Sequence, residues 1–164
     1  MKRVEAFVVA SKRLRQNEVA ERVVKGFKDI ISEARTHIEY VDTTSPGCFI
    51  HCQAEFEGSM IGAGSLGKKG KPAEKVGEEA ARELNRAFMS DAPVDPWLVD
   101  QLIPYMALAT YRTGIESRMK IPELTRHART NIWIVQKFLR VEFEVKDNIM
   151  SCISRSQKKG IEGD

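Results

Sequence analysis

A histidine and two polar residues lie close together near the start of a predicted helix. In the segment LTRHARTNIWIVQKFL, His127, Thr130 and Asn131 are three to four residues apart, so they would share one helix face. A helix N-terminus attracts phosphate and favours the neutral, nucleophilic form of an imidazole. Arg126 and Arg129 would add donors for phosphate oxygens. The segment predicts a nucleophilic histidine beside a phosphate; the alternative is a surface histidine between solvated arginines.

An aromatic, a carboxylate and an amide occupy adjacent turns of another predicted helix. In VDPWLVDQL, these residues are Trp97, Asp100 and Gln101, on one edge of the helix. Such a set can stack a purine ring and hold a ribose hydroxyl or a metal, and base stacking on an aromatic face contributes roughly 1 to 3 kcal/mol. Considered alone, the segment is more typical of a tryptophan packed in the core with the two polar residues in solvent.

The loop GSLGKKGKP precedes a predicted helix, which is typical of phosphate-binding loops. The nucleotide P-loop pattern GxxxxGK[ST] is not met, because Ser65 replaces its first glycine and Pro72 its hydroxyl residue. Lys68, Lys69 and Lys71 remain candidates for contact with a nucleic-acid backbone, or they form a solvated basic turn.

The composition favours a folded protein in a reducing compartment. Of the 164 residues, 42% are hydrophobic and 30% charged, and the formal net charge is +3. No apolar stretch approaches the roughly 20 residues of a membrane span. Cys48, Cys52 and Cys152 are odd in number and form no CxxC motif, so we expect reduced thiols in a cytoplasm. The scattered His37 and His51 suggest no zinc site, and no GxSxG motif suggests a serine hydrolase.

Alternating strands and helices must position these residues. Periodicity predicts strands at 4–9, 37–41, 48–56 and 60–65, with helices from residue 19 and over 73–88, whose stripe ends at Phe88. After a boundary near residue 92 it predicts a helix over 96–108, one or two strands across 111–121, a helix ending near Leu139 and strands at 141–145 and 149–153. Pro104 should kink its helix and free the carbonyl of Asp100. Residues 156–164 should form a frayed tail.

Three segments together resemble the C-terminal portion of RNA 3'-terminal phosphate cyclases. They are KPAEKVGEEAARELNRAF, VDPWLVDQLIPYMALA and LTRHARTNIWIVQKFLRVEFEV, in the order and spacing of that family. The resemblance runs from the first strand to about Val145, and its most specific elements are the DQL and HxxTN segments.

The resemblance implies an ATP-dependent reaction. His127 would attack the α-phosphate of ATP, form a covalent histidine–AMP and pass AMP to an RNA 3'-phosphate, which becomes a 2',3'-cyclic phosphate. Trp97 stands where the family often has a tyrosine against adenine; Asp100 and Gln101, with Thr130 and Asn131, would contact the nucleotide. The implied cofactors are ATP and a divalent cation, Mg or Mn, and the implied partner is an RNA 3'-phosphate end.

The resemblance also implies a fold of the α/β (α+β) class. Residues 1–91 resemble the family's insert domain, and residues 92–164 resemble the last of its βαβαββ repeats. The earlier repeats supply further arginines, a metal ligand and much of the pocket, so catalysis should require an N-terminal half or self-association. An exposed apolar surface on the last repeat would favour a split enzyme, since missing repeats normally cover it. The alternative is a non-catalytic cyclase-like RNA-binding or RNA-processing module, against which His127 argues.

Overall fold

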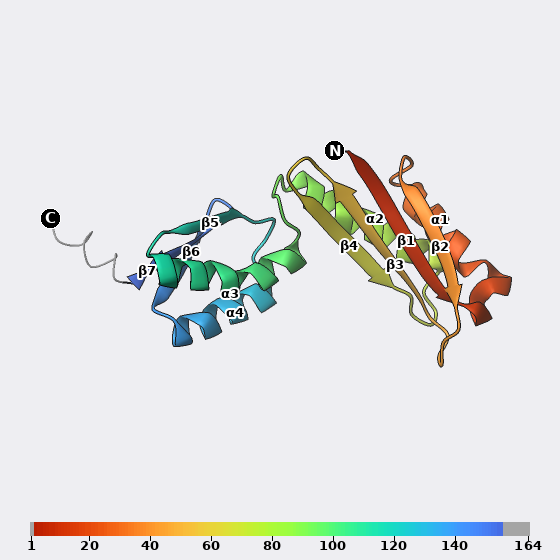
Figure 1. Ribbon diagram of the computed structural model, residues 1–164. Helices are drawn as coiled ribbons and strands as arrows, with labels where there is room; N and C mark the ends of the chain where they lie inside the picture. The colour runs from red at the N-terminus through yellow and green to blue at the C-terminus, as the bar shows by residue number, and fades with distance from the viewer. Residues whose placement is uncertain (1, 156–164) are drawn as a thin grey trace. The chain divides into compact units, whose positions relative to one another are not determined.

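The computed structural model describes residues 2–155 and divides the chain into two compact units, Met1–Met89 and Ser90–Asp164. Each unit combines helices with one sheet, which confirms the predicted α/β class (Figure 1). The hydrophobic cores of the two units are separate. The predicted tail, residues 156–164, lies outside the described residues.

The first unit is built on a four-stranded sheet in the order β2-β1-β3-β4. Its strands are β1 (Arg3–Ser11), β2 (Arg35–Val41), β3 (Cys48–Glu55) and β4 (Met60–Leu66). Strand β1 pairs parallel with β2 and antiparallel with β3, and β4 extends the sheet antiparallel to β3. The parallel pair needs a crossover, which the 3-10 helix η1 (Lys12–Asn17) and helix α1 (Val19–Lys28) supply.

Helices α1 and α2 (Ala73–Met89) cover one face of this sheet (Figure 1). Alternate residues of β1 and β3 point into the core between sheet and helices, as the period of a strand requires. The two helices approach closely at glycines. A Cβ on Gly26 would lie 2.0 Å from the carbonyl oxygen of Glu74, and one on Gly77 would lie 2.0 Å from that of Val23. No larger residue fits at either position without moving a helix.

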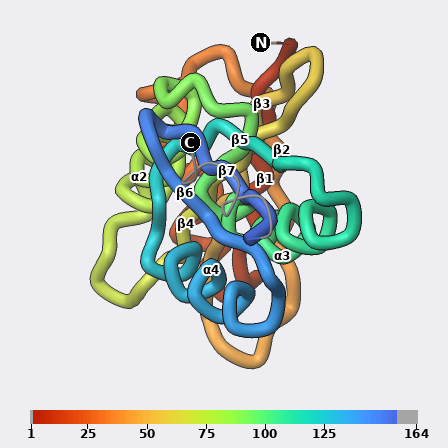
Figure 2. The backbone as a smooth tube through the Cα atoms, turned by 90° about the vertical axis from the view of Figure 1, so that its left-hand side faces the viewer, coloured from red at the N-terminus to blue at the C-terminus, as the bar shows by residue number. Residues whose placement is uncertain are grey.

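The second unit has the order α3 (Pro96–Thr113), β5 (Ser117–Lys120), α4 (Arg126–Phe138), β6 (Val141–Lys146) and β7 (Ile149–Ser154). Its antiparallel sheet has the order β5-β7-β6, and its elements can be followed in the tube of Figure 2. The central strand β7 contributes Met150 and Cys152 to the cores beneath the helices, where Val99, Ile103 and Ala128 pack.

Three sequence predictions fail in detail. Helix α3 does not end at residue 108 but continues to Thr113, so the strand predicted from residue 111 is only β5. The helix stops at Gly114, which adopts a left-handed φ of 71° and donates its amide to the carbonyl of Thr110. Phe88 is not buried with the rest of its stripe, because 45% of it is exposed.

The part of the second unit that the structure describes also lacks one strand of a βαβαββ repeat. Its described residues give the order αβαββ, and residues 90–95 form a turn and a bend before α3. The sheet therefore has three strands, with β5 and β6 as its edges.

Candidate nucleotide site on the second unit

The start of α4 is fixed by a side-chain cap and a buried anchor. Thr125 precedes the helix, and its hydroxyl accepts a hydrogen bond from the amide of Ala128 at 3.0 Å. Ala128 is fully buried, so the first turn is held against the core. His127, which lies between them on this first turn, is exposed. The predicted position of the histidine at a helix start is confirmed.

The start of α3 is capped in the same way. The carboxylate of Asp95 accepts hydrogen bonds from the amides of Trp97 at 3.0 Å and Leu98 at 2.8 Å. Pro96 occupies the first helical turn, where its missing amide has no cost. Trp97 is 61% exposed, so the alternative of a tryptophan packed in the core is wrong. Its indole is free to contact a ligand.

Asn131 connects the two helices through Asp100. Helix α3 continues through Pro104, which has no amide to donate to the carbonyl of Asp100. The side-chain amide of Asn131 donates to that carbonyl at 3.2 Å and also to the Asp100 carboxylate. The freed carbonyl predicted from Pro104 is thus used as an acceptor by the neighbouring helix.

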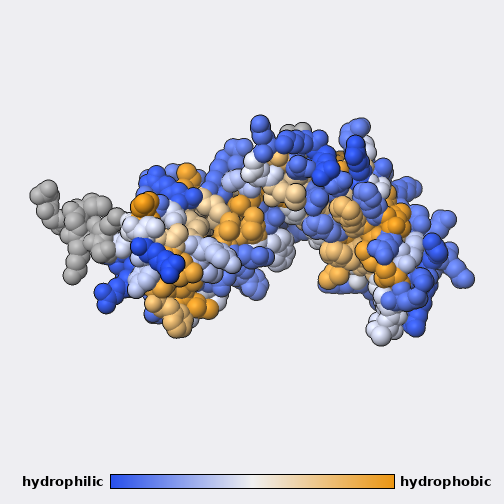
Figure 3. All heavy atoms as spheres, viewed as in Figure 1, coloured by the Kyte–Doolittle hydropathy of each residue, from blue (hydrophilic) through white to orange (hydrophobic). Residues whose placement is uncertain are grey.

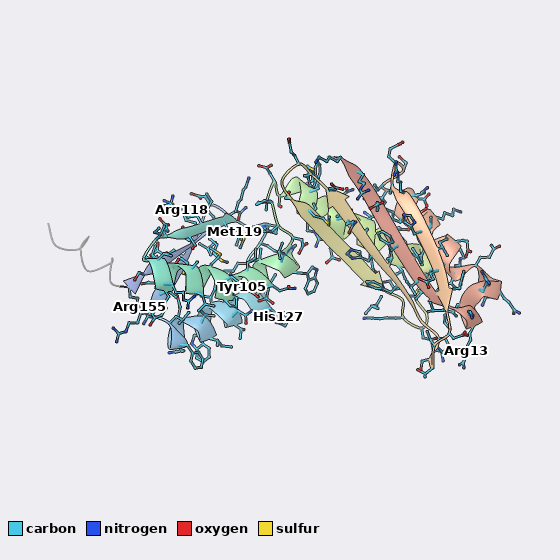
Figure 4. All side chains as sticks on the ribbon, in the orientation of Figure 1. Arg13, Tyr105, Arg118, Met119, His127 and Arg155 are labelled. Atoms are coloured by element: carbon cyan, nitrogen blue, oxygen red, sulfur yellow. The ribbon has the colours of Figure 1, made fainter. Side chains whose placement is uncertain are left out.

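This connection brings the predicted residues to one end of the helix pair. Helices α3 and α4 run in the same direction (Figure 1), and both His127 and Trp97 lie about one turn before the Asn131–Asp100 contact. Figure 4 shows His127 at the beginning of α4. Gln101 follows Asp100 and is exposed. The histidine and the tryptophan are therefore at the same end of the pair.

Only some of the polar side chains around His127 form hydrogen bonds within the protein. Arg126 and Arg129 are exposed, and no hydrogen bond or ion pair joins their side chains, or that of His127, to another described residue. The hydroxyl of Thr130 donates to the carbonyl of Arg126 at 3.0 Å, within its own helix. Two guanidinium groups near the start of α4 are thus available to an anion.

The described side chains around His127 do not form a metal-binding site. Among residues 2–155, no group of three or more His, Cys, Asp and Glu side chains is arranged to hold one. Asp100 is a single carboxylate and already accepts from Asn131. The described residues of this unit therefore offer no preformed set of three protein ligands for the divalent cation that the resemblance implies.

The second unit has the exposed apolar surface that would favour a split enzyme, although the sequence did not predict which residues form it; Figure 3 shows apolar side chains on the side that carries α3 and α4. The large members of this surface are Trp97, Tyr105, Leu108, Tyr111, Trp133, Ile134 and Phe138, from 40% to 83% exposed. On α4, Ile134 and Phe138 follow His127 at intervals of seven and eleven residues, which is one helix face. This regular spacing on a face turned away from the core was the available signal.

The three lysines of the loop GSLGKKGKP belong to the first unit, whereas His127 and Trp97 belong to the second. Lys68 and Lys69 are exposed, whereas Lys71 pairs with Glu79 and donates to the hydroxyl of Ser65 at 3.2 Å.

Known proteins resemble this chain over most of its length. Residues 1–88 match the family model described as RNA 3'-terminal phosphate cyclase (RTC), insert domain. The chain is 39% identical over 135 residues to the RNA 3'-terminal phosphate cyclase of Pyrococcus furiosus, covering 80% of this chain and 38% of that protein. It is 41% identical over 133 residues to that of Methanosarcina acetivorans, covering 79% and 35%. Over 86 residues it is 51% identical to that of Methanosarcina mazei, covering 52% and 23%.

The chain spans little more than a third of the length of the first two of these relatives. The family model matches more than half of the chain, and the similarity to the relatives extends past the residues that the model covers. The chain therefore belongs to the RNA 3'-terminal phosphate cyclase family.

Proposed function

We propose that this chain carries the nucleotidyl-accepting histidine of an enzyme that converts an RNA 3'-phosphate into a 2',3'-cyclic phosphate at the expense of ATP. The observation that carries the proposal is the exposed His127 on the capped first turn of α4, at the same end of the helix pair as the exposed Trp97. The relatives named RNA 3'-terminal phosphate cyclase supply the substrate class.

The proposed reaction begins at the imidazole. A neutral ring nitrogen of His127 attacks the α-phosphorus of ATP, an N–P bond forms, and the bond to pyrophosphate breaks. The adenylyl group then passes to an oxygen of the RNA 3'-phosphate, which restores the imidazole. The neighbouring 2'-hydroxyl attacks the activated phosphorus, loses its proton and displaces AMP, which leaves the cyclic phosphate.

The surrounding residues have distinct parts in this proposal. Trp97 stacks on the adenine, which stabilises bound ATP by roughly 1 to 3 kcal/mol. Arg126 and Arg129, together with the amides at the start of α4, attract the phosphates. Asp100 and Asn131 hold α3 against α4, so their first role is to position Trp97 relative to His127. Gln101 and Thr130 remain candidates for direct contact with the nucleotide. A divalent cation would be bound to the phosphates of ATP or held by residues of a partner, because the described residues present no group of three metal ligands.

A second polypeptide segment is part of the proposal. Seven large apolar side chains of α3 and α4 are exposed, and contiguous exposed apolar surface marks interaction sites. The relatives contain nearly two thirds of their length beyond the part that this chain matches. We infer that this remaining part of a cyclase covers the face, supplied either by a separately encoded N-terminal half or by a longer chain. The three free cysteines and the use of ATP favour a cytoplasmic enzyme.

The test uses a chimera in which this chain replaces the matching segment of the Pyrococcus furiosus cyclase. We expect the chimera to take label from α-labelled ATP, and none from γ-labelled ATP, in an acid-labile bond. His127→Ala should abolish the labelling. His37→Ala is the matched control, because His37 is an exposed histidine of the first unit, and it should label normally.

Two further arms separate the components of the proposal. Trp97→Ala should raise the ATP concentration for half-maximal labelling by about 5- to 150-fold, the equivalent of the stacking energy, and Trp97→Phe should restore part of the loss. The isolated chain should stay unlabelled. Labelling that survives His127→Ala removes the proposed nucleophile, and a folded chimera that binds RNA without labelling favours the non-catalytic module.

A further inference from the structure

The first unit contains a pocket of about 560 Å³ at one end of its sheet, remote in sequence from His127. It opens between the N-terminal ends of α1 and α2, the loop that precedes β3 and the loop that follows β4. Val19 and Ala73, the first residues of the two helices, both line it. Pockets of 300 to 1,000 Å³ are the usual size for small ligands or parts of larger ones.

The lining of this pocket is cationic. Four basic residues line it, and no aspartate or glutamate does. Arg22 is held by Glu74 through two hydrogen bonds of 2.7 and 2.9 Å, and Lys71 is held by Glu79. Lys68 and Lys69 are different, because both are exposed and no hydrogen bond or ion pair to another described residue occupies either ammonium group. Two lysines are thus available to an incoming anion.

The shape of the pocket depends on the loop that carries these lysines. A Cβ on Gly67 would lie 2.3 Å from the sulfur of Cys48 and 3.2 Å from its carbonyl oxygen, so a larger residue would displace the Cys48 side chain where the loop meets β3. Gly70 has a φ of 86°, which favours glycine. Burial raises the pKa of the Cys48 thiol, so this lining residue stays neutral and adds no negative charge.

The rest of the lining is apolar. Leu14, Val19, Pro46 and Pro72 provide a surface on which sugar or base carbons can pack. A free phosphate would leave this surface unused, whereas a nucleotide unit contacts both the cationic and the apolar parts. No aromatic residue lines the pocket, so it has no ring on which an adenine could stack, unlike the site at Trp97.

We propose that this pocket binds a phosphodiester segment of single-stranded RNA, with Lys68 and Lys69 contacting its phosphates and the apolar wall contacting one nucleoside. The choice of RNA rests on the proposed function, while the cationic pocket stands on its own geometry. The pocket would hold RNA independently of the adenylylation at His127 and without reading the base edges.

The experiment measures the fluorescence anisotropy of a 5'-fluorescein-labelled uridine 10-mer with a 3'-hydroxyl, titrated with the 164-residue chain. This RNA has no 3'-phosphate, so binding does not depend on the cyclase reaction. Lys68→Gln/Lys69→Gln should weaken binding about 25-fold at 0.1 M salt. The log–log salt slope should fall in magnitude by about 1.4, since each phosphate contact to a single strand contributes about 0.7.

The matched control is Lys25→Gln/Lys28→Gln, which removes the same charge at the other end of α1 and should bind like the parent chain. Leu14→Trp fills the pocket without changing its charge, so it should weaken binding and leave the salt slope unchanged. Circular dichroism verifies that each variant is folded.

Several outcomes would overturn the inference. They are no binding by the parent chain, parent-like affinity and slope in the Lys68/Lys69 variant, or an equal loss in the Lys25/Lys28 control. Full displacement of the RNA by equimolar inorganic phosphate or ATP would make it a site for small anions instead. His127→Ala should leave this binding unchanged, so the pocket and the proposed nucleophile can fail separately.

Discussion

Replacing Asn131 with alanine should destabilise the second unit, because the carbonyl of Asp100 would lose its hydrogen-bond donor. Pro104 has no amide that could donate to this carbonyl within the helix. In the parent protein Asn131 donates to this carbonyl at 3.2 Å and to the Asp100 carboxylate. The substitution removes both bonds while the two acceptors stay half-buried. Helices α3 and α4 should then separate more readily at their N-terminal ends.

The size of the effect follows from the two bonds. A neutral hydrogen bond contributes a net 0.5 to 1.5 kcal/mol, and one to a charged group about 1.5 to 3 kcal/mol. Because water reaches part of this site, we expect the substitution to lower the free energy of unfolding by about 2 kcal/mol. Pro104→Ala supplies the missing backbone amide, so in that background Asn131→Ala should cost about 1 kcal/mol less, which is a typical coupling between neighbouring residues.

Native-state hydrogen exchange is the appropriate assay, because the two units have separate cores and a single melting curve would mix them. Amides of α3 and α4 should exchange roughly 30-fold faster in Asn131→Ala than in the parent protein. In the Pro104→Ala background, adding Asn131→Ala should speed their exchange only roughly 5-fold over Pro104→Ala alone. Amides of β1 and β3 serve as the internal reference and should not change.

Two results would refute this reasoning. The first is an Asn131→Ala protein whose α3 and α4 amides exchange at the parent rate, which would mean that the bonds contribute nothing to stability. The second is an equal cost of Asn131→Ala with proline or alanine at position 104. That result would show that the asparagine does not replace the donor that proline removes.

Three further predictions concern the first unit. Gly77→Ala should lower the free energy of unfolding of this unit by about 1 to 3 kcal/mol, because the new methyl group forces α1 and α2 apart. Urea denaturation with a spectroscopic probe in the first unit measures this change. Arg22 lowers the pKa of Glu74 to about 2 from 4.5, so the stabilisation is complete above pH 4.5 and disappears as the pH falls through 2; Glu74→Gln should flatten the stability profile between these values. Cys52 is buried and its pKa is raised to about 12, so mass spectrometry should find alkylation at Cys48 first and at Cys52 only after unfolding.

Local sequence patterns predicted most of the secondary structure. The strands of the first unit, α2 and the hairpin of β6 and β7 follow from alternation and helical spacing, because each of these elements buries one regular face. The prediction failed after residue 108 because the β-branched and aromatic residues there suggested a strand. The buried Thr110, whose hydroxyl donates to the carbonyl of Cys152 at 3.2 Å, packs as part of a helix instead. Phe88 fits a helical stripe but lies beyond the core, which periodicity cannot detect.

The sequence alone determined which residues could do chemistry and that helix starts would carry them. His127 and Trp97 each follow a local capping signal, at Thr125 and Asp95, which acts within a few residues. Only the tertiary structure decided that these two starts lie together, since the Asn131–Asp100 contact joins residues 31 positions apart. It also decided that the apolar face is uncovered and that the loop lysines line a pocket. These properties depend on packing between distant segments, which no short sequence pattern encodes.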